Sequence, residues 1–159
     1  EDEFIDEDIN LKGYLKEIII SFKETSKKEF ILNVDQDSNS KKITKSIEII
    51  YGLRNFIGNA NKYSKKKIYI SLKSDNEFSE IIIEDDGEGY PNDIISKIGE
   101  PYLKTVSQNN KGMSGLGLGI FIGKTLLEKN FASINCRNSE TRRGAEVRIK
   151  WKNKDLFKI

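Results

Sequence analysis

The order in which helical and strand-like hydrophobic patterns follow one another restricts the fold of this chain more than any other feature. Three segments carry apolar residues three and four positions apart, the period of an amphipathic helix, at residues 8–27, 42–63 and 116–130. Short apolar or alternating segments typical of strands occupy residues 30–34, 67–73, 80–85, 132–137 and 145–151. This order predicts helices layered on one face of a mixed sheet.

Two less regular segments complete the pattern. Residues 92–99 predict a short helix with Pro91 near its start, where proline costs little. Residues 101–114 lack apolar periodicity and are rich in Gly, Asn, Ser and Lys, which indicates a functional lid or a disordered loop. With 159 residues, the chain has the size of one domain with a single core.

The apolar stripes of two predicted helices indicate which faces should be buried. For residues 42–63 the expected stripe is Ile43, Ile47, Ile50, Leu53, Ile57 and Ala60. For residues 116–130 the expected side is Leu118, Phe121, Ile122, Thr125 and Leu126.

The composition excludes several classes of protein. The chain has no histidine, which rules out triads, dyads and zinc sites that use imidazole. Its 27 basic and 25 acidic residues nearly cancel, unlike the charge of a nucleic-acid binder. Cys136 is the only cysteine, so no intramolecular disulfide can form and a reducing, cytoplasmic compartment fits best. No apolar stretch approaches the ~20 residues that cross a bilayer.

Three motifs carry candidate chemistry. Asn55, Asn59 and Lys62 lie at helical positions i, i+4 and i+7, so they should share a narrow face opposite the apolar stripe. Amide oxygens are hard ligands suited to Mg²⁺, and the ammonium could meet phosphate oxygens. A solvated polar face is the alternative interpretation.

The second motif, residues 85–89 (DDGEG), follows a strand that should be buried. A carboxylate fixed there, at Asp85, could accept a hydrogen bond from an exocyclic amino group such as that of adenine, while Gly87 and Gly89 permit close approach. A simple strand-ending turn remains the alternative.

The third motif is the glycine run at residues 112–119 (GMSGLGLG). The neighbouring Gly123-Lys124-Thr125 imitates a P-loop, but Leu118 stands where its first glycine would be and the helical pattern continues through the segment. The run predicts a helix start whose free N–H groups and positive dipole end favour phosphate, unless it is only a flexible loop.

In this order the motifs resemble the catalytic and ATP-binding domain of sensor histidine kinases, within the wider group of gyrase, ninety-kilodalton chaperone and mismatch-repair ATPase domains. Residues 55–63 (NFIGNANKY) resemble the kinases' N box and residues 85–89 the G1 box. Residues 99–102 (GEPY) resemble the F box and residues 115–118 (GLGL) the G2 box, although Met113 replaces the first glycine of that box. The second half of the chain is most similar to the redox-responsive RegB/PrrB subgroup.

The resemblance implies the Bergerat ATP-binding fold: an α+β, two-layer α/β sandwich with a mixed, mostly antiparallel sheet and about three helices on one face. It implies that residues 1–8 are the remnant of a linker and that residues 9–159 form the catalytic domain, with a lid at about 100–115. ATP and Mg²⁺ are the implied ligands.

The resemblance also implies a role for each matching residue. Asn59 would coordinate Mg²⁺, while Asn55 and Lys62, the catalytic pair, would lie near the phosphates. Asp85 would bind the adenine amino group. The remaining positions would complete the nucleotide site: Tyr63 against the adenine, Gly87 and Gly89 at the pocket edge, Gly115, Leu116, Gly117 and Leu118 around the phosphates, and Tyr102 and Lys104 in the lid.

The N box also distinguishes between kinds of ATP chemistry. Members of the group that hydrolyse ATP resemble one another in having a glutamate at its first position, where it activates water. Here that residue is Asn55, and an amide cannot serve as a general base near neutral pH. We therefore expect a domain that holds ATP until another nucleophile arrives and contributes positioning and charge neutralisation.

That nucleophile would be a histidine, which this chain lacks, so we expect a catalytic fragment that binds Mg-ATP without phosphorylating itself. Its expected partners are its own dimerisation and phosphoacceptor domain and a response regulator, with no nucleic acid. The parent protein is expected to be a membrane-attached homodimer and the fragment a monomer. Two alternatives stay open: an anti-sigma-factor-type serine kinase of the same fold, and a non-catalytic, nucleotide-free interaction module.

Overall fold

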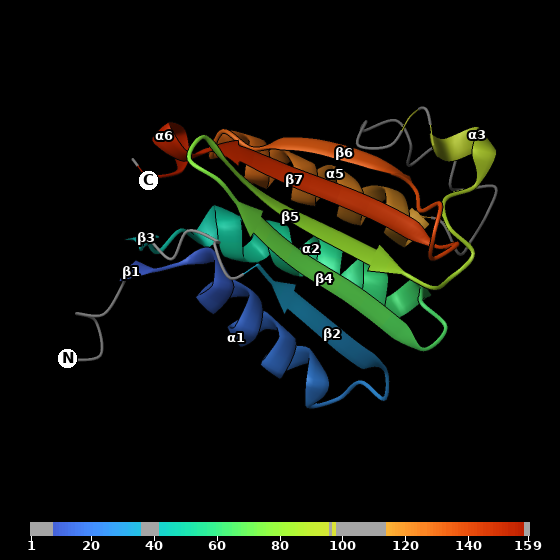
Figure 1. Cartoon of the computed structure of the whole chain (residues 1–159). Helices are drawn as coiled ribbons and strands as arrows, with labels where there is room; N and C mark the ends of the chain where they lie inside the picture. Colours follow the sequence, from blue (N-terminus) through green and yellow to red (C-terminus); the bar gives the residue numbers. More distant parts are fainter. Residues whose placement is uncertain (1–7, 36–41, 96, 98–113, 158–159) are drawn as a thin grey trace.

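A five-stranded sheet in the order β2-β4-β5-β7-β6 forms one layer of the molecule (Figure 1). The computed structural model describes residues 8–35, 42–95, 97 and 114–157. β2 runs parallel to β4, and the other neighbouring strands pair antiparallel, so the predicted mixed, mostly antiparallel sheet is confirmed. The strands are β2 (Glu29–Val34), β4 (Lys67–Ser74), β5 (Phe78–Asp85), β6 (Ser133–Asn138) and β7 (Ala145–Lys152).

The second layer consists of helices on one face of this sheet. α2 and α5 lie behind β4, β5 and β7 in Figure 1, and α1 packs beside them along β2. One continuous core joins the two layers, with Leu53, Ile70, Ile83 and Ile149 almost fully buried. The helices are α1 (Leu11–Lys23), α2 (Ile47–Tyr63), α3 (Asn92–Ile95), α5 (Ser114–Lys129) and α6 (Asn153–Leu156).

The predicted start of α2 was wrong by five residues. The side chain of Ser46 caps the helix by accepting a hydrogen bond from the Ile49 N–H at 3.3 Å. Before the cap, β3 (Ile43–Thr44) pairs with β1 (Asp8–Ile9) in a separate two-stranded sheet. Ile43 therefore continues the hydrophobic pattern of the helix in sequence, but it belongs to a strand.

The first helix is also shorter than predicted. α1 begins after Asn10, whose side chain accepts a hydrogen bond from the Gly13 N–H at 2.7 Å, and it ends at Lys23. Asp8 lies in β1, and the rest of the predicted linker lies outside the described residues. The predicted helix at 92–99 is described as α3 only up to Ile95, and the C-terminal α6 was not predicted.

Close packing of α2 on α5 explains why their buried faces differ from the predicted ones. A Cβ atom on Gly52 would lie 2.5 Å from Cγ of Leu127, and one on Gly123 would lie 2.8 Å from Cε2 of Phe56. Glycines thus make part of the buried contact, which a hydrophobic pattern does not reveal. Residues expected inside lie outside instead: Ile47 is 66% exposed, Leu118 46% and Ile122 37%.

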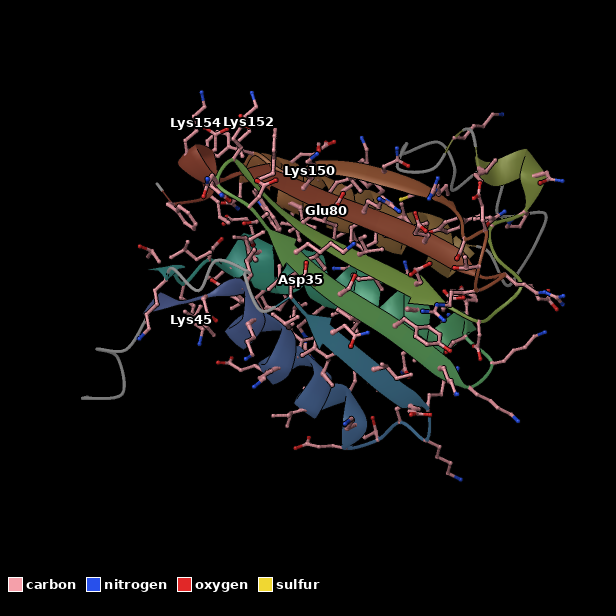
Figure 2. All side chains as sticks on the ribbon, viewed as in Figure 1. Asp35, Lys45, Glu80, Lys150, Lys152 and Lys154 are labelled. Atoms are coloured by element: carbon pink, nitrogen blue, oxygen red, sulfur yellow. The ribbon has the colours of Figure 1, made fainter. Side chains whose placement is uncertain are left out.

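The face of the sheet opposite the helices carries charged side chains. In Figure 2, Glu80 and Lys150 project from neighbouring strands of this face, and the strand register pairs them directly. The Nζ of Lys150 also lies 4.3 Å from the centroid of the Phe78 ring. Because one face of the sheet is polar and the other apolar, the core lies between the sheet and the helices, and the candidate site lies there too.

Candidate functional site

A cavity of about 260 Å³ opens between the C-terminal half of α2 and the ends of β5 and β7. Its walls are mostly apolar and contain a few polar groups, the composition typical of a small-molecule site. The segment after β5 forms one rim. The lining residues are Phe56, Asn59, Ala60, Tyr63, Lys65, Ile83, Asp85, Glu88, Gly89, Tyr90, Pro91, Ala145 and Val147.

Asp85 is the most buried acid of this cavity, with 3% of its surface exposed. Its Oδ1 accepts hydrogen bonds from the N–H groups of Gly87, at 2.8 Å, and Ala145, at 3.3 Å. No group of the described residues donates to Oδ2, which leaves that oxygen as an acceptor for a bound molecule. Burial raises the pKa of Asp85 above its ordinary value, although the two N–H donors oppose this effect.

Glycines allow the chain to pass close to Tyr63 and to turn at the rim. A Cβ atom on Gly87 would lie 2.2 Å from the carbonyl oxygen of Tyr63. Gly89 has a φ of 80°, in the left-handed region that favours glycine. The motif that ends β5 therefore requires glycine at both positions for steric reasons.

Asn59 projects from α2 toward α5, whereas the helical spacing predicted that it shares a face with Asn55 and Lys62 opposite the apolar stripe. A Cβ atom on Gly119 would lie 3.1 Å from its Oδ1. Its Nδ2 is buried and has no hydrogen-bond partner within the described part of the chain. This free Nδ2 can donate to a phosphate oxygen, whereas a hard cation would be held by the amide oxygen Oδ1.

Asn55 and Lys62 lie outside the cavity lining. Nδ2 of Asn55 donates to the carbonyl of Tyr51 at 2.7 Å, an arrangement that leaves its Oδ1 as the free acceptor. Lys62 is exposed, and its Nζ lies 5.4 Å from the centroid of the Tyr63 ring. Tyr63 itself lines the cavity.

The glycine run forms the start of α5, two residues earlier than predicted. The helix begins at Ser114, so the backbone N–H groups of its first turn, which includes Gly115, Leu116 and Gly117, have no acceptor within the helix. Leu118 is exposed. Tyr102 and Lys104 lie outside the described residues, as do most of the predicted lid and the F box.

Asp86 supports the site in a way that sequence reasoning missed. Asp86, for which the sequence predicted no separate role within the 85–89 motif, accepts hydrogen bonds from the backbone N–H groups of Lys65 at 2.7 Å, Lys66 at 3.1 Å and Lys67 at 3.2 Å. Burial raises the pKa of Asp86, but these three donors outweigh it and the pKa falls below its ordinary value. The carboxylate thus ties the loop after α2 to the motif that ends β5.

A sequence profile of the histidine kinase-, DNA gyrase B- and HSP90-like ATPases matches residues 44–155, a range that contains every residue lining the cavity. The chain belongs to this family. The resemblance drawn from the N, G1 and G2 boxes is thereby confirmed at the level of the family.

Among the curated relatives of this ATPase-family chain are two named sensors. RegB of Cereibacter sphaeroides is 39% identical over 108 residues, which make up 65% of this chain and 23% of RegB. SrrB of Staphylococcus aureus is 33% identical over 100 residues, or 62% of this chain and 17% of SrrB. The chain therefore spans less than a quarter of the length of these relatives. The similarity to RegB agrees with the predicted subgroup.

Histidine kinase domains are among the solved structures with the same fold. The mycobacterial sensor histidine kinase MprB has a TM-score of 0.72 at 18% identity, covering 92% of this chain and 96% of that one. The catalytic domain of the histidine kinase ThkA has a TM-score of 0.73 at 20% identity, covering 91% and 95%. These matches support the predicted Bergerat-type fold. No helix within the described part of this family member is long and apolar enough to cross a bilayer.

Proposed function

We propose that this chain binds ATP in the cavity beside Asp85 and presents the γ-phosphoryl group to a histidine on another domain. The observation that carries the proposal is the state of Asp85: a buried carboxylate whose Oδ1 is held by two backbone N–H groups while Oδ2 remains available. Such an oxygen can accept a hydrogen bond from the exocyclic amino group of adenine. The apolar side chains of Phe56, Ile83 and Val147 would enclose the ring.

The triphosphate would extend from the adenine toward Asn59 and the start of α5. The free N–H groups of the first turn of α5 and its positive dipole end favour phosphate there. We infer that Asn59 holds a Mg²⁺ ion, with Asn55 and Lys62 nearby at the phosphates. A bound Mg²⁺ would supply neutralisation of the phosphate charge during transfer.

The chemistry of the cavity favours transfer over hydrolysis. Asn55 occupies the position where a water-activating acid would be needed, and an amide has no usable basicity near neutral pH. The two acids that line the cavity, Asp85 and Glu88, both belong to the motif that ends β5, and Oδ1 of Asp85 already accepts two backbone N–H groups. The nucleophile must come from outside, because the chain contains no histidine.

In the proposed reaction, an imidazole nitrogen of an external histidine attacks the γ-phosphorus. The bond from that phosphorus to the β–γ bridging oxygen breaks, and ADP leaves with the bonding electrons. The described residues bind and orient ATP and keep the adenine out of water. A response regulator is the proposed final acceptor of the phosphoryl group.

Calorimetry with Mg-ATP tests the binding step, using the parent and Asp85→Asn. We expect the variant to lose about 1.5–3 kcal/mol of binding free energy, or roughly 10- to 150-fold in affinity, because a hydrogen bond to a charged acceptor is lost. Glu80→Gln, on the charged face of the same strand and absent from the cavity lining, is the matched control and should bind as the parent does. Equal affinity of the parent and Asp85→Asn would refute the adenine assignment.

Transfer is tested with γ-labelled ATP. We expect no label on the chain alone and label on an added helical dimerisation domain that carries a histidine. Label on the chain itself would contradict the requirement for an external histidine. Label on a serine of an added partner would favour the serine-kinase alternative, and absence of any ATP binding would favour the non-catalytic module.

A further inference from the structure

Asn138, the last residue of β6, holds the backbone of the cavity rim from outside the cavity. The Tyr90 N–H donates to its Oδ1 at 2.6 Å, and its Nδ2 donates to the Tyr90 carbonyl at 3.1 Å. One amide side chain therefore satisfies both backbone groups of Tyr90, as a neighbouring strand would. Asn138 is absent from the cavity lining, whereas Tyr90 belongs to it.

The contact extends to the residue before Tyr90. A Cβ atom on Gly89 would lie 2.6 Å from Oδ1 of Asn138, so any larger residue at position 89 would push the amide away. Gly89 is also the only described glycine with a positive φ, and glycine alone adopts that conformation at no steric cost. The two hydrogen bonds between Asn138 and the Tyr90 peptide groups hold the backbone that follows Gly89 in this conformation.

A second residue of β6 contacts the side chain of Tyr90. Cys136 lies two positions before Asn138, on the same side of the strand, and its thiol interacts with the Tyr90 hydroxyl. Burial raises the pKa of the Cys136 thiol to about 11 and that of Tyr90 well above its ordinary value, so both groups stay neutral. β6 therefore contacts Tyr90 at its backbone and at its hydroxyl.

We infer that Asn138 is a positioning residue for nucleotide binding, which fixes the rim at Gly89 and Tyr90 so that the cavity keeps its shape when empty. The inference rests on the proposed function for its nucleotide part. Asn138 does not contact the cavity, so its effect on binding must pass through Tyr90. A rim that is already ordered in the empty cavity lowers the entropic cost of ligand binding.

The first test is amide hydrogen exchange of the nucleotide-free chain followed by NMR. We expect Asn138→Ala to speed exchange of the Tyr90 N–H by tenfold or more, while amides in the centres of β5 and β7 keep their protection. Asn135→Ala is the control, because Asn135 lies on the same strand but is exposed. Unchanged exchange at Tyr90 in Asn138→Ala would overturn the inference.

The second test measures the affinity of each variant for Mg-ATP. It is carried out without urea, at a temperature at which urea titrations show that every variant is folded before urea is added. We expect affinity to fall five- to twentyfold in Asn138→Ala and to stay at the parent value in Asn135→Ala. Asn138→Asp keeps the acceptor for the Tyr90 N–H but loses the donor, so it should retain protection at Tyr90 and bind with intermediate affinity. A purely structural role would change the urea midpoint without this order of affinities.

The two tests separate this inference from the proposed function. Parent-like ATP affinity in Asn138→Ala, with Tyr90 exchange increased, would refute the positioning role but leave the proposed function intact. Absence of ATP binding by the parent would refute both, and the exchange measurement would then report only on the contact between Asn138 and Tyr90. Should Asn138→Ala fail to fold, Asn138→Ser serves in both experiments.

Discussion

Gly144 lies directly against the carboxylate of Asp85: a Cβ atom on Gly144 would lie 2.1 Å from Oδ1 and 2.1 Å from the backbone oxygen of Asp85. Gly144 ends the connection between β6 and β7, about 60 residues beyond Asp85 in the chain, yet the two residues are in contact. The next residue, Ala145, donates its N–H to the same Oδ1. The turn before β7 therefore shapes the acid at the floor of the cavity.

Replacing Gly144 by Ala should move Asp85 and weaken nucleotide binding. The added methyl group would meet backbone and carboxylate atoms that cannot rotate away, so we expect about 1–3 kcal/mol of destabilisation and at least a tenfold loss of Mg-ATP affinity. Urea unfolding and calorimetry measure the two effects. Gly58→Ala is the control, because a Cβ atom there lies 3.4 Å from Phe22, an ordinary contact. Parent-like affinity in Gly144→Ala would contradict the steric argument.

Asp85→Asn should make the nucleotide-free chain more stable at pH 7, although it weakens binding. Burial raises the pKa of Asp85 in the folded state above the ordinary value of 3.8, so the fold favours the neutral carboxyl group. The stability that the neutral Asp85 carboxyl contributes is fully present at pH values below its unfolded pKa. It is lost as the pH rises through the higher pKa of the folded state. The gain from Asn should therefore be largest near pH 7 and shrink toward pH 4. Urea titrations at several pH values measure it; a less stable variant at pH 7 would disprove the sign.

The strands were predictable from their apolar residues, and β4 shows this directly, because its alternating residues Ile68 and Ile70 are buried on one face. The buried side of α5 was not, because Gly123 packs against Phe56 and carries no hydrophobic signal. Asn59 was identified by type and spacing, but its direction toward α5 depends on how two helices pack. Sequence periodicity reports local geometry and not the pairing of distant elements.

The supporting contacts of the site escaped sequence reasoning for a related reason. Asn138 and Tyr90 are separated by 48 residues, and Asp86 and Lys65 by 21. A side chain that bonds to the backbone of a distant segment leaves no periodic pattern, since any polar residue at a strand end looks like a turn residue. Motif resemblance pointed to residues that line the cavity, such as Asp85 and Tyr63, whereas these supports depend on the packing of distant segments.

Lys28→Met should destabilise the C-terminal end of α2. The Nζ of Lys28 donates to the carbonyl of Ser64 at 2.8 Å and to that of Asn61, and so places a positive charge at the negative end of the helix dipole. We expect the free energy of unfolding to fall by about 1–2 kcal/mol. Urea unfolding measures the change, and Lys27→Met, at an exposed neighbouring position, is the matched control. Equal losses in the two variants would show that the contacts of Lys28 contribute nothing specific.

Glu146→Gln should lower stability at neutral pH and leave it nearly unchanged in acid. Glu146 is only 3% exposed, and its Oε2 accepts hydrogen bonds from Nε of Arg137 at 2.6 Å and Nε of Arg148 at 2.8 Å. Burial raises the pKa of this carboxyl, but the two arginines outweigh burial, so the pKa lies below the ordinary value of 4.5. A carboxyl group whose pKa is lower in the folded state than in the unfolded state stabilises the fold at pH values above its unfolded pKa. That stabilisation is lost as the pH falls through the folded pKa.

We expect the parent to exceed Glu146→Gln by about 1–2 kcal/mol at pH 7, because both arginines are partly exposed and solvent weakens the pair. The difference should narrow below about pH 4.5, where the carboxylate of the unfolded chain takes up its proton. Urea midpoints across this range measure it, with Glu140→Gln, at an exposed position of the β6–β7 connection, as the control. A difference that stayed constant with pH would mean that shape and not charge makes Glu146 stabilising.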